Sequence, residues 1–439
     1  MSFSVTPIAP LEAARHFIDK IQKPSRLLVA ISGGSDSTGL LMALDRVCRD
    51  AGRADISLHA VSIDHALRPE SGAEARGVAA LCTRMGIPHH LRRWDTAKPA
   101  TGLSAAARLA RYALIADVAD DIGADMIVVG HTRGDQLETI AMRGARSARQ
   151  DNLGLAGMAD AMLYGGRHWI VRPFLNSTRQ DIRDFLSGEG QSWVEDPSND
   201  DMKYERVRTR HLPLLEDRSL MDQSIQRSTL ALDAAHFVEN AFQSYGHGLV
   251  GLPVACLDAS SATLRYALSA VACVIGGRRF SMAAQTLDKV VSFAMQSEPG
   301  RMTAGRVVFD RRREALYLMR ENRDLPAIMI PGGGKAIWDG RMEVANLSGL
   351  DMTFRAAGSD MVAADFPASV PAGVVRRVRQ TLPVIESHEG PQLAESRPEA
   401  VSMRPVLAPY DVFLPRFDYE LANRIARLVG RGTYPPAPL

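Results

Sequence analysis

A turn of two glycines flanked by hydroxyl and carboxylate side chains is the first part of the sequence equipped for chemistry. The residues SGGSDS, at 32–37, follow the apolar run RLLVAI and precede a helical pattern. Such a turn lets backbone N–H groups approach phosphate oxygens, and a helix N-terminus favours anions. The pattern is neither GxGxxG nor a loop ending in Gly-Lys-Ser/Thr. We therefore expect a phosphate-binding loop of another kind. Its members are Ser32, Gly33, Gly34, Ser35, Asp36 and Ser37.

Asp36 lies inside this loop, where a carboxylate would repel phosphates unless a cation joins them. Mg²⁺ binds carboxylate and phosphate oxygens together, so we predict that Asp36 is a Mg²⁺ ligand. The alternative is an ordinary helix start, in which Ser and Asp side chains satisfy free backbone amides.

Two further polar clusters each follow an apolar run. Asp64 and His65 follow residues 56–63, and HTRGDQLET, which begins at His131, follows residues 124–130. His131 can hydrogen-bond a phosphate or a base and move a proton near neutral pH, or it is a satisfied loop histidine. Asp135 and Glu138 can hold a metal or an amine, or they cap the helix that begins there.

The spacing of apolar residues predicts the elements that position these clusters. Apolar strands at 26–32, 56–63, 89–94 and 124–130 alternate with helical patterns, among them 104–123. This alternation predicts an α/β fold with a doubly wound, mostly parallel sheet, which binds ligands at the carboxyl ends of its strands. In the helix at 104–123, Arg108 and Arg111 are three residues apart and can face a nucleotide together, or they lie on a solvated face.

The pattern changes after about residue 150. A strand at 167–175 and a helix at 178–188 precede a mostly helical stretch at 220–295, and short strands between Gly and Pro breaks follow from residue 301. We predict three parts: a catalytic domain at 1–217, a helical domain at 218–300 and a small β-rich region at 301–439.

The composition of the 439 residues is that of a folded protein, with 46% hydrophobic and 23% charged residues. The formal net charge is only +2, but just six of the 52 basic residues are lysine. The excess of arginine suits phosphate recognition, and a GC-rich genome would produce it as well. We predict a cytoplasmic protein, since no apolar run approaches the ~20 residues of a membrane span. The four cysteines form no CxxC pair and indicate neither a zinc site nor a disulfide framework.

Several segments together resemble a known family. SGGSDS with DHALRPES at 64–71 is similar to the PP-loop of the N-type ATP pyrophosphatases, which cleave ATP between the α and β phosphates. Within that group the chain resembles the tRNA(Ile)-lysidine synthetases. The segments that carry this resemblance run from about residue 25 to 215, in the expected order: AAARLARY, GHTRGDQLETIAMR, NLGLAGM and WVEDPSNDDMKYERVRTR.

The resemblance implies substrates and partners: ATP with Mg²⁺, free L-lysine, and a tRNA(Ile) with a CAU anticodon, acted on by a monomer or a homodimer. It implies that Arg111 contacts ATP and that Arg206 acts in catalysis with Asp36 and His131. The stretch of Arg206, Arg208 and Arg210 would bind tRNA, although an exposed basic helix start would look the same. Near the C-terminus, Arg376, Arg377 and Arg379 are weaker candidates for touching tRNA.

The chain departs from the family pattern, and two rival functions remain open. The pattern HHxDDQxET is HTRGDQLET here, so Thr132 replaces a histidine and Gly134 replaces an aspartate. The loss of a carboxylate leaves a catalytically silent tRNA-binding protein as one alternative. Another is a different PP-loop tRNA-modifying enzyme, such as a thiolase, although the paired cysteines that thiolases of this group generally need are missing from the sequence.

Overall fold

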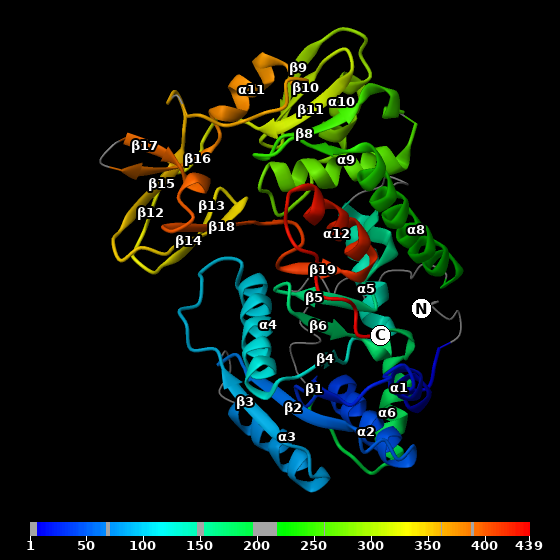
Figure 1. Ribbon diagram of the computed structural model, residues 1–439. Helices are drawn as coiled ribbons and strands as arrows, with labels where there is room; N and C mark the ends of the chain where they lie inside the picture. The colour runs from blue at the N-terminus through cyan, green and yellow to red at the C-terminus, as the bar shows by residue number, and fades with distance from the viewer. Residues whose placement is uncertain are drawn as a thin grey trace. The chain divides into compact units, whose positions relative to one another are not determined.

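The computed structural model describes residues 7–66, 71–146, 153–195, 217–258, 260–360, 362–387 and 390–439 (Figure 1). The chain forms two compact units. The first comprises Met1–Arg227 with Pro435–Leu439, and the second comprises Ser228–Tyr434. The predicted Arg206, Arg208 and Arg210 fall outside the described residues.

The first unit is built on a mostly parallel sheet. Its strands lie in the order β5 (Ala161–Tyr164), β6 (His168–Val171), β4 (Met126–Val129), β1 (Ser25–Ala30), β2 (Ile56–Asp64) and β3 (His89–Arg93). Neighbours from β6 to β3 are parallel, and β5 runs antiparallel to β6. Because chain order moves outward from β1 in both directions, the carboxyl end of β1 is the switch point where such sheets bind ligands.

Helices cover both faces of this sheet. They are α1 (Pro10–Ile18), α2 (Ser35–Asp50), α3 (Ser71–Met85), α4 (Leu103–Ile122), α5 (Arg133–Arg146) and α6 (Arg179–Gly188), with short 3₁₀ turns at Leu153–Ala156 and Pro173–Asn176. In Figure 1, α2 and α3 lie on one side of the strands and α4 on the other. The predicted doubly wound α/β fold is confirmed. The strand predicted at 167–175 is shorter, because Pro173 lacks the N–H that would continue the ladder and begins a 3₁₀ turn instead.

Two helices far apart in the sequence, α2 and α6, pack unusually closely. A Cβ on Gly39 of α2 would lie 2.4 Å from Cγ2 of Ile182 on α6. Ile182 and Leu186 are fully buried there. The first turn of α6 therefore lies beside the first turn of α2, where the glycine loop ends.

The second unit contains the predicted helical region, with α8 (Asp217–Ala241) entering it, followed by α9 (Ala262–Ile275) and α10 (Ala284–Ala294). Two short strands interrupt these helices: β7 (Gln243–Ser244) and β8 (Val250–Pro253). They form an antiparallel sheet with β11 (Ala315–Arg320), β10 (Val307–Arg311) and β9 (Gly300–Ala304), in the order β7-β8-β11-β10-β9. The prediction that 220–295 is mostly helical missed β8, which pairs with β11 and whose Val250 and Leu252 are buried.

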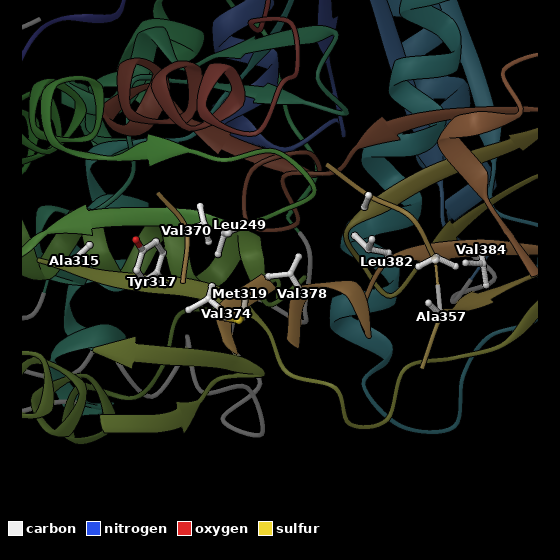
Figure 2. Close-up of a cluster of buried hydrophobic side chains, with 12 residues drawn as sticks. Leu249, Ala315, Tyr317, Met319, Ala357, Val370, Val374, Val378, Leu382 and Val384 are labelled. Atoms are coloured by element: carbon white, nitrogen blue, oxygen red, sulfur yellow. The ribbon is translucent and has the colours of Figure 1, made fainter. Parts of the chain in front are cut away.

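The rest of the second unit is β-rich, as predicted. One sheet has the order β12 (Ile328–Ile330), β15 (Met352–Ala356), β16 (Pro383–Ser387) and β17 (Gly390–Leu393). Another has the order β13 (Lys335–Trp338), β14 (Met342–Asn346) and β18 (Val401–Pro405). Helix α11 (Ala372–Arg379) supplies Val374 and Val378 to an apolar cluster that includes Tyr317 and Met319 of β11 (Figure 2). Strand β19 (Phe413–Pro415) and helix α12 (Tyr419–Leu428) follow.

The predicted domain limits at 217 and 300 stay a prediction. One sheet of the second unit takes β8 from before residue 300 and β10 and β11 from after it. In the described part of the chain, no helix is long and apolar enough to cross a membrane.

The close approach of α2 and α6 predicts that a methyl group added at Gly39 destabilises the protein. We expect Gly39→Ala to lower the free energy of unfolding by about 1–3 kcal/mol, because the new Cβ overlaps a fully buried isoleucine. Urea unfolding of the full chain measures the change.

Gly77→Ala is the matched control, since this glycine of α3 is exposed and a Cβ there meets no atom within 4 Å. Its stability should rise slightly through helix propensity. Equal stability of the two variants would contradict the close packing of α2 on α6.

Candidate functional site

The three polar clusters lie at one edge of the parallel sheet, as predicted. The SGGSDS loop follows β1, Asp64 ends β2, and His131 comes two residues after β4. Because β1 pairs with both β2 and β4 in parallel register, their carboxyl ends are neighbours. His131 is partly buried at this edge.

The SGGSDS loop is held by its own hydroxyl groups. The backbone N–H of Ser32 donates to Ser37 Oγ at 3.1 Å, and the two serine Oγ atoms are 3.2 Å apart. Ser37 Oγ also donates to the Gly34 carbonyl at 3.3 Å. Gly34 is the N-cap of α2 and has no side chain with which to cap the first turn. The amides of a first turn without such a cap suit an anion, so the loop has the form of a phosphate site.

Gly33 joins this loop to two other segments. Its φ of +88° lies in the region that favours glycine. A Cβ there would also lie 3.3 Å from Cγ2 of Val78, a residue of α3. The Gly33 carbonyl accepts a hydrogen bond from the N–H of Val194 at 2.9 Å. Thus the start of the WVEDPSN segment is fastened directly to the glycine loop.

Asp36 is engaged by an arginine that the sequence analysis missed. Arg179, the first residue of α6, donates from Nη2 to Asp36 Oδ2 at 2.9 Å and from Nε to Oδ2 and Oδ1 at 3.1 and 3.3 Å. Ser35 Oγ donates to Oδ1 at 3.1 Å. No local signal marks Arg179, because 143 residues separate it from Asp36 and only folding brings them together.

Asp135 caps helix α5. Its Oδ2 accepts from the N–H of Thr132 at 2.7 Å and from Thr132 Oγ1 at 3.1 Å, and the bond to the Thr132 N–H is one half of a capping box. Its other oxygen lies 3.9 Å from Nη2 of Arg179. Both Asp135 and Glu138 are buried. The structure thus shows Asp135 in the helix-cap contact, and a role of Asp135 or Glu138 in holding a metal or an amine stays a prediction.

The negative charges of Asp36, Asp135 and Glu138 all act on the guanidinium of Arg179. Burial alone would lower the pKa of this guanidinium. The hydrogen bond and charge of Asp36, with the charges of Asp135 and Glu138, outweigh burial and raise the pKa above its usual value. Arg179 therefore stays charged as the counter-ion of this acidic group.

Arg111 forms a second polar group with His65. Its Nε and Nη2 lie 3.3 and 3.2 Å from His65 Nε2. Burial and then the charge of Arg111 lower the pKa of His65, so the neutral ring can accept these bonds. Arg108 lies over the ring of Tyr112, 5.1 Å from its centroid. The predicted nucleotide residue Arg111 is thus tied to the residue that follows β2.

The surroundings of Asp36 suit a magnesium ion that binds together with a nucleotide. They suit less well an ion whose ligands all come from the protein. Within the residues that the structure describes, no group of three or more His, Cys, Asp or Glu side chains is arranged to hold a metal ion. Mg²⁺ commonly takes one or two carboxylates and completes its shell with substrate phosphates and water. A single carboxylate beside a phosphate-type loop meets that requirement.

The candidate arginines of α11 divide into two kinds. Arg377 donates to Asp310 Oδ2 at 2.8 Å, and Arg379 donates to the Ala364 carbonyl at 3.0 Å. Arg376 is exposed. Two of the three therefore serve contacts inside the second unit, which leaves Arg376 as the exposed candidate.

Three of the four cysteines are buried: Cys48, Cys82 and Cys273. Burial raises the pKa of each thiol to about 11. A thiol with so high a pKa forms little thiolate at neutral pH and is a poor nucleophile. These cysteines serve as small core residues.

Comparison with known proteins agrees with the motifs. A family model described as a PP-loop domain matches residues 10–215. Three curated relatives are each described as a tRNA(Ile)-lysidine synthase. That of Rhizobium meliloti is 42% identical over 99% of this chain and 98% of its own length. Those of Mesorhizobium japonicum and Brucella anthropi are 37% and 34% identical over 94% and 93% of this chain, and 94% and 95% of their own lengths. The predicted resemblance is confirmed.

A solved structure, a U34-tRNA thiolase NcsA from Methanococcus maripaludis with its [4Fe-4S] cluster, is also similar. Its TM-score is 0.39, and it is 12% identical over 46% of this chain and 70% of its own. The full-length relatives, rather than this structure, carry the family assignment.

The cap of α5 predicts a measurable stability effect. We expect Thr132→Val to lower the free energy of unfolding by about 1 kcal/mol, because the fully buried hydroxyl bonds Asp135 and valine keeps its shape. Thermal unfolding of the full chain measures the difference.

Thr139→Val is the control on the same helix, since its hydroxyl only donates to the Asp135 carbonyl one turn earlier. That bond contributes little to helix stability. A Thr132→Val protein no less stable than the control would argue against the cap.

Proposed function

Because the chain belongs to the tRNA(Ile)-lysidine synthase family, we infer that it is an ATP-dependent ligase that makes lysidine in tRNA(Ile). The observation that carries this inference is 42% identity over 99% of the chain to a curated member. The product forms when the side-chain nitrogen of lysine joins C2 of the wobble cytidine in a CAU anticodon. This modification changes codon reading from AUG to AUA.

The reaction has two steps. The C2 oxygen of cytidine first attacks the α-phosphorus of ATP, and pyrophosphate leaves. The lysine side-chain amine then attacks C2, loses a proton, and expels the oxygen as part of AMP. Adenylation is needed because an unmodified C2 oxygen is a poor leaving group. The protein must stabilise negative charge on the phosphates in the first step and accept a proton in the second.

The SGGSDS loop is the proposed binding site for the ATP phosphates. Its serine hydroxyls are fixed by the bonds between Ser32 and Ser37, so they are oriented before ATP arrives. Gly33 and Gly34 allow close approach to the backbone, and Ser35 orients the carboxylate of Asp36. Arg111, fixed against His65, is the proposed cationic contact to the nucleotide.

Asp36 is the proposed ligand for Mg²⁺ that accompanies ATP. When bound, this ion would neutralise charge on the phosphates as pyrophosphate leaves. The support is the place of Asp36 within the loop, in the first turn of α2, where Ser35 and Arg179 bond both of its carboxylate oxygens.

His131 is the proposed group for proton movement, since it stands at the carboxyl end of β4 near the loop. Glu138 is buried and its charge acts on Arg179, so it is the better candidate of its pair for attracting the lysine amine. Asp135 already caps α5. These roles stay proposals, as does that of Arg206.

The tRNA is the proposed partner of the basic stretch that contains Arg206, Arg208 and Arg210. The segment leading into it is fastened to the glycine loop through Val194. Phosphate contacts from this stretch would position the tRNA on the enzyme. We also propose that the enzyme acts in the cytoplasm as a monomer or homodimer.

The two rival functions are less well supported. A thiolase would need paired, reactive cysteines, whereas the four cysteines form no CxxC pair and Cys48, Cys82 and Cys273 are buried with raised pKa values. A silent tRNA-binding protein is not favoured by the curated relatives, which are described as synthases and match nearly the whole chain.

Release of AMP by the purified protein tests the function. We expect AMP only when ATP, Mg²⁺, lysine and an unmodified CAU-anticodon tRNA(Ile) transcript are all present, and radiolabelled lysine should become attached to the tRNA. AMP formation that ignores lysine would indicate another acceptor. Tight tRNA binding without AMP would favour the silent binding protein.

The proposed role of Asp36 predicts that its loss stops AMP release without preventing tRNA binding. We expect Asp36→Ala to abolish AMP release and to leave tRNA affinity within about tenfold, since the change acts locally, at the phosphate loop and its ion pair with Arg179. Filter binding measures the affinity.

Asp50→Ala is the control, because this aspartate lies on the same helix and its Arg46 partner is exposed. It should leave both properties unchanged. Parallel losses of turnover and tRNA affinity in Asp36→Ala would contradict the assignment.

A further inference from the structure

Arg179 takes up both oxygens of the carboxylate that is proposed to bind metal. Its Nε and Nη2 reach Asp36 in a forked arrangement, at 2.9–3.3 Å. The side chain of Asp36 is 19% exposed and that of Arg179 is 33% exposed, so water screens the pair only partly. A forked bond of this kind is among the stronger polar contacts in proteins.

The helix itself does not call for an arginine at this position. Arg179 stands at the N-terminus of α6, where the helix dipole disfavours a positive charge. Thr178 already caps this helix, because its Oγ1 accepts from the N–H of Asp181 at 3.1 Å. The packing of α6 on α2 comes from Ile182 and Leu186. What Arg179 adds is charge, placed at Asp36.

That charge stands where a metal ion would stand. A divalent cation on Asp36 would use the oxygen lone pairs that now accept the guanidinium, and it would be repelled by that guanidinium at close range. ATP can relieve this competition, because its phosphates bring further oxygen ligands for the metal and can accept hydrogen bonds from a displaced arginine.

We propose that Arg179 is a positioning residue that serves as the built-in counter-ion of Asp36 and competes with divalent cations for its carboxylate. This inference rests on the proposed metal role of Asp36. Arg179 thereby keeps the metal affinity of the nucleotide-free enzyme low and aims the Asp36 carboxylate at the loop. The metal then binds together with ATP rather than before it.

Mn²⁺ binding to the full chain without ATP, lysine or tRNA tests this proposal. The readout is the electron paramagnetic resonance signal of free Mn²⁺ during titration. We expect Arg179→Gln to bind Mn²⁺ about tenfold more tightly than the parent, since a forked, charge-assisted competitor is gone. The gain should vanish in the double variant Arg179→Gln/Asp36→Asn.

Two further variants keep the test sharp. Arg179→Lys retains the charge without the fork, so its affinity should fall between those of the parent and Arg179→Gln. Arg46→Gln is the matched control: this arginine of α2 also pairs with an aspartate, Asp50, at 3.0 Å, but on the surface. It should bind Mn²⁺ as the parent does.

Three results would overturn the proposal. They are an Arg179→Gln affinity within about twofold of the parent, a gain that persists with Asp36→Asn, and no Mn²⁺ binding by any variant. Lysidine synthesis does not enter the measurement, so a failure of the proposed reaction would show in the AMP assay and leave this result intact.

Discussion

The contact between α2 and α6 at Gly39 determines where the charged groups of the glycine loop lie. Gly39 and Ile182 approach so closely that a side chain at 39 would overlap the isoleucine. Asp36 and Arg179 each come three residues earlier, so they lie on the same helix faces, one turn nearer the N-termini. An apolar contact in a close-packed interior resists deformation. The contact between Gly39 and Ile182 therefore fixes the separation of Asp36 and Arg179, one helical turn away. The geometry of the carboxylate thus depends on a residue that takes no part in chemistry.

The sheet supplies the second constraint, and the sequence was sufficient to predict it. Apolar runs broken by the SGGSDS turn, by Asp64 and by His131 are local signals, and β1, β2 and β4 begin and end close to the predicted limits. Parallel strands need a crossover between them, so each run had to end at the same edge. The meeting of the three clusters therefore follows from alternation of strands and helices, without knowledge of any long-range contact.

Other features depend on contacts that no local pattern contains. Arg179 and Asp36 are 143 residues apart, and the residues around Arg179 predict only a helix start. Val250–Pro253 lies in a stretch with helical character, and a four-residue apolar run does not distinguish strand from helix. Pairing with β11 decided the outcome. For Asp135, the spacing that suits ligand binding also suits a capping box, and only the bonds to Thr132 separate the two.

The charge of Asp36 poses a conflict that the structure resolves in one specific way. A carboxylate in a phosphate-binding loop repels its ligand, so the sequence alone required a cation there. The structure meets that requirement with the guanidinium of Arg179. A permanent cation removes the repulsion before ATP arrives, whereas a metal bound in advance would need ligands that the described residues do not group together. In the proposed site, Asp135 bonds Thr132 and Gly134 offers no carboxylate, so the phosphates of ATP would supply most of the remaining metal ligands.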